Sequence, residues 1–79
     1  MTRKELDEVF REAKESKLDV FVAVTIPGQK DLEYIVNKYP SLDNKLAYYH
    51  KAYDENLTHA MNDQIKIVKA GMIDFYMGD

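Results

Sequence analysis

The chain has 79 residues, of which 46% are hydrophobic and 32% are charged, so it can build one compact core and is too short for two. Its 11 basic and 14 acidic side chains leave a net charge of −3, which disfavours contact with nucleic-acid phosphates or an anionic membrane and favours basic partners. The absence of cysteine excludes disulfides, thiolate zinc sites and a cysteine nucleophile.

The hydropathy pattern predicts a cytoplasmic protein with a single domain over residues 1–79. The longest apolar run, residues 20–24, is far shorter than the roughly 20 residues that a membrane-spanning helix needs. The chain is charged from Arg3 onward, which is not typical of a signal peptide. We therefore expect no contact with a membrane.

A first helix is predicted to begin at Thr2 and to end near Ser16. Thr2 and Glu5 have the spacing of a capping box, in which each side chain accepts a backbone N–H of the other residue. Apolar residues then recur every three or four positions, as on one face of a helix: Leu6, Val9, Phe10 and Ala13. This pattern predicts an amphipathic helix.

Two strands are predicted to follow, joined by a short turn. Residues 20–26 are apolar on both alternating faces and rich in valine, which is typical of a central strand covered on both sides. Pro27 and Gly28 fit the central positions of a type II turn. Residues 32–37 alternate more cleanly, which is typical of an edge strand. The short turn makes these strands antiparallel neighbours.

A second helix is predicted from Leu42 to Ala60, with Ser41 as its N-cap. Its apolar stripe recurs through about five turns: Leu42, Leu46, Tyr49, Tyr53, Leu57 and Ala60. Asn62 and Asp63 are predicted to end this helix.

Residues 64–70 return to a period of two and predict a third strand, with a bulge or bend at Gly71. The apolar segment from Met72 to Met77 either extends this strand or forms part of a homo-oligomer or partner surface.

These elements predict an α+β fold with the order α-β-β-α-β. A crossover through the second helix can place the third strand beside the free side of the first. The three-stranded sheet is then mainly antiparallel with strand order 2-1-3, and its most apolar strand lies in the centre. The helices are expected to pack on this sheet.

The sequence offers no catalytic or metal-binding pattern, so we predict neither an enzyme nor a bound cofactor. His50 and His59 are nine residues apart and would lie on opposite sides of one helix, where they cannot share a metal ion. Each is better explained as an exposed residue with a weak carboxylate partner four positions away, which is Asp54 for His50 and Glu55 for His59. Ser16 and Ser41 lie at helix boundaries and lack a glycine elbow.

Tyrosines concentrate in the second helix and point to a binding function. Tyr49 and Tyr53 lie on the apolar stripe and are expected in the core, whereas Tyr48 points away and is either part of an interface or a lone surface residue. Four residues on and after this helix are candidates for protein contact: Tyr48, Asp54, Glu55 and Asp63. Direct nucleic-acid binding is not expected, because a basic groove is missing.

Residues 45–57 and 65–71 together with residues 20–28 resemble small proteins encoded by phages and prophages of Gram-positive bacteria. The resemblance is one of overall pattern and carries no catalytic signature. It implies a protein that binds a host or phage protein in the host cytoplasm, and some such proteins inhibit host defences such as CRISPR nucleases by placing an acidic surface in a basic groove.

The leading hypothesis from the sequence is a non-enzymatic phage protein that binds a partner with a basic surface and inhibits a host defence or nucleic-acid-handling protein. The alternative is a self-assembling structural or accessory phage protein, for which a homodimer is one expected state. Binding of a small ligand between sheet and helix is a third hypothesis that no sequence feature favours.

Overall fold

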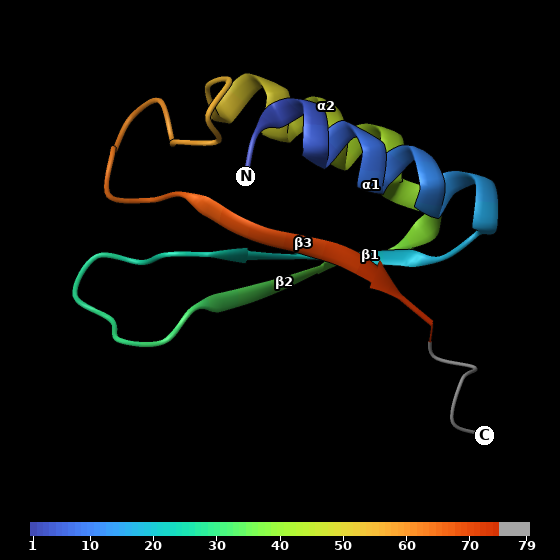
Figure 1. Cartoon of the computed structure of the whole chain (residues 1–79), viewed down its shortest axis with the longest axis horizontal. Helices are drawn as coiled ribbons and strands as arrows, with labels where there is room; N and C mark the ends of the chain where they lie inside the picture. Colours follow the sequence, from blue (N-terminus) through green and yellow to red (C-terminus); the bar gives the residue numbers. More distant parts are fainter. Residues whose placement is uncertain (75–79) are drawn as a thin grey trace.

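Two helices and three strands make up the structure (Figure 1), a computed structural model in which residues 1–74 are described. The elements in chain order are α1 (Arg3–Ser16), β1 (Asp19–Val24), β2 (Glu33–Asn37), the 3-10 helix η1 (Tyr39–Ser41), α2 (Leu42–Ala52) and β3 (Ile67–Ile73). The α+β class and the order α-β-β-α-β confirm the prediction from the sequence.

Helix α1 forms as its sequence predicts. The hydroxyl of Thr2 accepts the N–H of Glu5, and the Glu5 carboxylate accepts the N–H of Thr2 at 2.8 Å, which completes the capping box. The predicted apolar stripe faces the core: Leu6, Phe10 and Ala13 are buried, and Val9 is partly buried. The helix ends at Ser16 and is capped by Lys17, whose φ of 59° lies in the left-handed region and whose N–H donates to carbonyls of the last turn.

In the described part of the chain, the sheet has three strands in the order β2-β1-β3, and both neighbouring pairs are antiparallel. The predicted strand order 2-1-3 is therefore confirmed, with β1 in the centre. The turn between β1 and β2 forms as expected, because the N–H of Gln29 donates to the Ile26 carbonyl at 3.1 Å and Gly28 has a φ of 82°.

Strand β3 lies three residues later than predicted. Residues 64–66 belong to the preceding loop, where the N–H of Ile65 donates to the Asn62 carbonyl. The bulge lies at Val68 and not at Gly71 as predicted. Ala23 pairs with Lys69 and Val24 pairs with Ile67, which leaves Val68 without a partner on β1, whereas Gly71 pairs regularly with Phe21. Residues 72 and 73 continue the strand, and residues 75–77 lie outside the described part.

The molecule has two layers, because α1 and α2 both lie on the same face of the sheet (Figure 1). Strand β1 directs Val20, Val22 and Val24 into the core between the layers. The prediction that β1 is covered on both sides was wrong, since no described helix covers the second face. The remaining buried core residues come from the helices, the long loop and β3: Leu6, Phe10, Ala13, Leu42, Tyr49, Tyr53, Leu57 and Ile67.

Helix α2 ends at Ala52, two turns before the predicted end at Ala60. Tyr53 has extended backbone angles, and residues 53–66 form an ordered loop with isolated bridges between Tyr53 and His59 and between Thr58 and Lys66. Leu57 suggested a continuing helix because its spacing fits the apolar stripe. It does reach the core, with 0% exposure, but from a loop position with a φ of 59°.

At the start of α2, Ser41 is the N-cap position as predicted, although its side chain makes no capping hydrogen bond.

Candidate functional site

Tyr48 lies on the outward side of α2 and is 55% exposed, as the sequence predicted. Its ring meets the buried ring of Tyr49 edge to face, with the ring centroids 5.4 Å apart. Tyr49 and Tyr53 are buried in the core, which confirms the second part of the prediction. One side of the Tyr48 ring therefore packs against the protein, and the other side is exposed.

Asp54 and Glu55 are both exposed in the turn that follows α2. The Asp54 carboxylate accepts the backbone N–H groups of Asn56 at 2.8 Å and Thr58 at 3.0 Å, so it holds the turn in shape. The Glu55 carboxylate has no hydrogen bond or ion pair within residues 1–74. Of these two predicted contact residues, only Glu55 therefore offers an unengaged charge.

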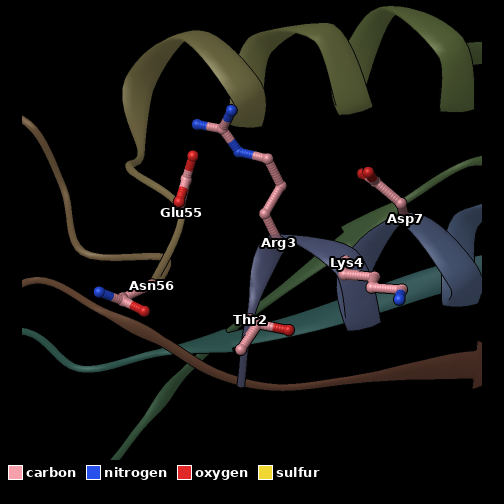
Figure 2. A pocket seen from close by; sticks show the side chains of 6 residues that line it. All are labelled: Thr2, Arg3, Lys4, Asp7, Glu55 and Asn56. Carbon is pink, nitrogen blue, oxygen red and sulfur yellow. The ribbon is translucent and has the colours of Figure 1, made fainter.

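A pocket of about 500 Å³ opens where the N-terminus of α1 meets this turn (Figure 2). Its six lining residues are Thr2, Arg3, Lys4, Asp7, Glu55 and Asn56. The structure thus brings Glu55 to the start of α1, where the Arg3 N–H donates to the Glu55 carbonyl at 2.9 Å. Tyr48 and Asp63 do not line this pocket, and the exposed Asp63 lies in a separate turn of the loop. The four predicted contact residues are therefore not brought together in one pocket.

The polar groups in this pocket mainly hold the two helices together. The Arg3 guanidinium donates to the His50 and Tyr53 carbonyls at 3.2 and 2.7 Å and so caps the end of α2, while its Nε atom is buried without a partner. The Asp7 carboxylate lies 2.5 Å from the His50 imidazole. Sequence reasoning missed both contacts, because their partners are more than 40 residues apart and no local pattern marks them.

At the start of α1, beside the pocket, the side chains of Thr2 and Glu5 are engaged with each other. The hydroxyl of Thr2 is engaged in the capping box with Glu5. The Glu5 pKa is lowered, first because its carboxylate accepts the Thr2 backbone N–H, so this carboxylate favours the charged form and is not poised as a proton donor. Within residues 1–74, no three His, Asp or Glu side chains are grouped to hold a metal ion.

The histidines have partners that the sequence did not predict. His50 contacts Asp7 of α1 instead of Asp54. His59 lies in the loop, not on a helix, and its Nδ1 accepts the N–H of Met61 while its ring meets Tyr53 edge to face at 5.1 Å. The proposed pairing of His59 with Glu55 through helical spacing was therefore wrong.

The uncovered face of the sheet carries apolar side chains that the sequence analysis did not single out. The register of the strands places Phe21, Tyr34 and Val36 on this face, where Tyr34 is 56% and Val36 is 46% exposed. The rings of Phe21 and Tyr34 lie 5.9 Å apart. Lys69 pairs with Ala23 and adds one cation to the same face. We refer to Phe21, Tyr34, Val36 and Lys69 as the open-face cluster.

Strand β2 has its more polar face turned inward. Asn37 is completely buried between sheet and helices, whereas the apolar Tyr34 and Val36 on the opposite face are exposed. The Asn37 side chain is accommodated because its amide donates to the Val20 carbonyl at 3.2 Å and accepts the Tyr49 hydroxyl at 2.9 Å. The alternation of β2 was visible in the sequence, but the face that it buries depends on Tyr49 from α2, which local patterns do not reveal.

No protein-family model, no curated protein and no solved structure matches this chain. Among residues 1–74, neither helix has the length and apolar character required to cross a membrane.

Proposed function

We propose that this chain is a non-enzymatic module that binds another protein through the open-face cluster. The observation that carries this proposal is the inverted strand β2, in which Asn37 is buried while Tyr34 and Val36 are exposed. A strand in a two-layered protein normally turns its apolar face to the core. Departures from this rule concentrate at functional sites, because an exposed apolar face has a cost that only a partner offsets.

The composition of the open-face cluster fits a protein partner. Aromatic side chains are enriched in protein interfaces, and here Phe21 and Tyr34 stand on neighbouring strands with their rings 5.9 Å apart. Strands hold these rings with little backbone freedom, so binding costs less ordering entropy than it would on a loop. Lys69 has no ion pair among the described residues, so it is available to a carboxylate. We therefore expect a partner with an apolar surface next to an acidic group.

A second candidate is the contact expected from the sequence, in which an acidic surface binds the basic groove of a host or phage protein and inhibits it. The exposed ring of Tyr48 and the unengaged carboxylate of Glu55 favour it. However, acidic and basic groups alternate on the helices, where Arg11 bridges Glu8 at 2.6 Å and Glu15 at 3.0 Å. Such mixed charges weaken the long-range attraction to a basic groove.

One binding experiment separates these surfaces. The purified protein would be immobilised and exposed to a bacterial lysate, and the retained proteins would be identified and then measured for affinity after purification. The variant Tyr34→Ser removes the central ring of the open-face cluster, and the matched variant Tyr48→Ser removes the exposed ring of α2. Circular dichroism would show that both variants keep the fold.

We expect Tyr34→Ser to weaken a specific partner at least about tenfold and Tyr48→Ser to leave its affinity unchanged. The reverse result would move the contact to the Tyr48 and Glu55 surface and overturn the proposal. Glu55→Lys would then weaken binding in a salt-dependent manner. Equal retention of every protein by all variants would also contradict binding through the open face.

A further inference from the structure

The outer edge of β2 directs unpaired backbone groups away from the sheet. The N–H of Thr25, just after β1, donates to the Lys66 carbonyl and so points toward the β3 side. In an antiparallel strand the backbone groups of successive residues point to alternate sides, so the even-numbered residues of β1 direct theirs toward β2. Val22 of β1 pairs with Ile35, so the backbone groups of Ile35 point toward β1. Tyr34 and Val36 consequently direct their N–H and C=O groups outward, and neither residue has another backbone hydrogen bond among the described residues.

The two edges of the sheet differ in their protection against pairing. Strand β3 has the bulge at Val68 and a lysine at its third position, Lys69, and both features discourage the addition of a further strand. Strand β2 pairs with β1 without a register shift, and its five residues contain neither lysine nor proline. In the described part of the chain, β2 is therefore the unprotected edge.

We infer that a second copy of this chain pairs with β2 along this edge, in antiparallel orientation about a two-fold axis at Ile35. This arrangement places Tyr34 opposite Val36 of the partner subunit, and these are the residues whose backbone groups point outward. An aromatic residue opposite a β-branched one is a favourable cross-strand pair. Glu33 then faces Asn37 of the partner subunit, so no like charges meet across the new ladder.

The dimer deepens the proposed function, because it joins the two open-face clusters on one face of a continuous six-stranded sheet. The two-fold axis runs perpendicular to the sheet and therefore keeps both clusters on the same side. A paired strand of five residues is only about 17 Å long, which gives less than the roughly 1,200 Å² of a stable interface. We therefore expect a weak dimer, with half-dissociation at roughly 10–100 μM.

The dependence on salt concentration distinguishes this dimer from the binding of an acidic surface to a basic partner. Each subunit carries a net charge of −3, so two copies repel one another, and added salt screens this repulsion. Dimerisation should therefore strengthen with salt. Binding of an acidic surface to a basic groove should weaken under the same conditions.

The dimer is tested by sedimentation velocity of the purified protein over a range of concentrations, in low and high salt. Val36→Pro removes one outward N–H without removing a hydrogen bond to β1, since that N–H points away from the sheet. The matched variant Val36→Thr keeps both the N–H and the β-branched shape. We expect the wild-type protein and Val36→Thr to dimerise and Val36→Pro to remain a monomer with an unchanged circular dichroism spectrum.

Hydrogen exchange followed by NMR tests the same pairing without any substitution. Dimerisation through β2 should slow exchange of the Tyr34 and Val36 amides as protein concentration rises, while the Ile35 amide stays protected at every concentration. A concentration-independent exchange of both amides would overturn the inference, as would a dimer that persists in Val36→Pro. A strictly monomeric wild-type protein would also overturn it, while loss of partner binding in Tyr34→Ser would still support the open face as a binding surface.

Discussion

The hydroxyl of Tyr49 donates a hydrogen bond to the side-chain carbonyl of Asn37 at 2.9 Å, and both side chains are buried. This contact joins α2 to the end of β2. The side-chain NH₂ of Asn37 also donates to the Val20 carbonyl of β1. The Asn37 side chain on β2 therefore contacts both the neighbouring strand β1 and helix α2. The inward orientation of Asn37, and with it the outward orientation of Tyr34 and Val36, rests on this hydrogen bond.

Replacement of Tyr49 by phenylalanine should lower the free energy of unfolding by about 1–2 kcal/mol. The substitution keeps the ring but leaves a buried acceptor of Asn37 without a donor, and an unsatisfied buried group carries most of its desolvation cost. Urea denaturation measures the change. Tyr48→Phe is the matched control and should change stability by less than about 0.5 kcal/mol, because its hydroxyl is on an exposed side chain. Equal effects of both substitutions would contradict the structural role of the hydrogen bond.

Alkaline pH should destabilise the protein through its buried tyrosines. Burial raises the pKa of Tyr49 and of Tyr53 above the ordinary value of 10.0, because the charged phenolate loses hydration in the core. The unfolded chain releases these protons near pH 10, before the folded state does. The contribution of these two tyrosines to the free energy of unfolding should therefore be constant below about pH 10 and fall above it.

This alkaline effect is measured from urea midpoints between about pH 8 and about pH 11. Tyr49→Phe should reduce the loss of stability above pH 10, since the variant no longer contains one of the shifted groups. Met61→Ala removes no titratable group from an 88% exposed position and should retain the wild-type slope. An unchanged slope in Tyr49→Phe would show that this ring does not contribute to the alkaline transition.

Replacement of Leu57 by alanine and by glycine should give proteins whose order of stability is unusual. Its side chain is completely buried, so Leu57→Ala should cost about 2–5 kcal/mol. Its φ of 59° is unfavourable for any residue with a Cβ, and glycine relieves this strain by roughly 1 kcal/mol. We therefore expect Leu57→Gly to be at least as stable as Leu57→Ala, the reverse of the order in a helix.

Thermal unfolding of the two Leu57 variants measures this order directly. Met61→Ala serves as a control in the same loop, because Met61 is 88% exposed and should be replaceable without a measurable effect. A clearly higher stability of Leu57→Ala than of Leu57→Gly would indicate a helical conformation at this position and would contradict the loop.

A side chain at Gly71 should cost less stability when Phe21 is reduced in size. A Cβ atom built on Gly71 would lie 2.7 Å from Cε1 and 3.0 Å from Cζ of the Phe21 ring. The ring would have to turn and lose part of its contact with Tyr34, so Gly71→Ala should cost about 1 kcal/mol. In the background of Phe21→Leu, the same substitution should cost close to nothing, and a double-mutant cycle measures this coupling. Additive effects would show that the two residues do not contact.

The parts of the fold that local patterns determine could be predicted from the sequence. The capping box of Thr2 and Glu5 and the turn at Gly28 act within a few residues, and the valine-rich strand was correctly placed in the centre. The end of α2 could not be predicted, because Leu57 keeps the apolar spacing of a helix while it reaches the core from a loop. Helical spacing alone does not show whether a buried apolar residue such as Leu57 belongs to the helix or to the loop that follows it.

Less of the candidate site could be predicted from the sequence, because it depends on contacts between residues that are far apart in the chain. The exposure of Tyr48 followed from its position on the helix. The role of Arg3 depends on carbonyls about 50 residues later, and the outward face of β2 depends on Tyr49. The sequence contains these residues but does not show that they meet.

The position of β1 in the centre of the sheet also affects the order in which the fold assembles. Strand β2 pairs with β1 across the loop of residues 25–32, with Val24 opposite Glu33. Strand β3 pairs with β1 only after the chain has passed through α2, with Val24 opposite Ile67. Closing the longer loop costs more chain entropy and gives slower contacts. We therefore expect the hairpin of β1 and β2 to form first and β3 to dock last. Until it docks, both edges of the hairpin are open to other chains during synthesis.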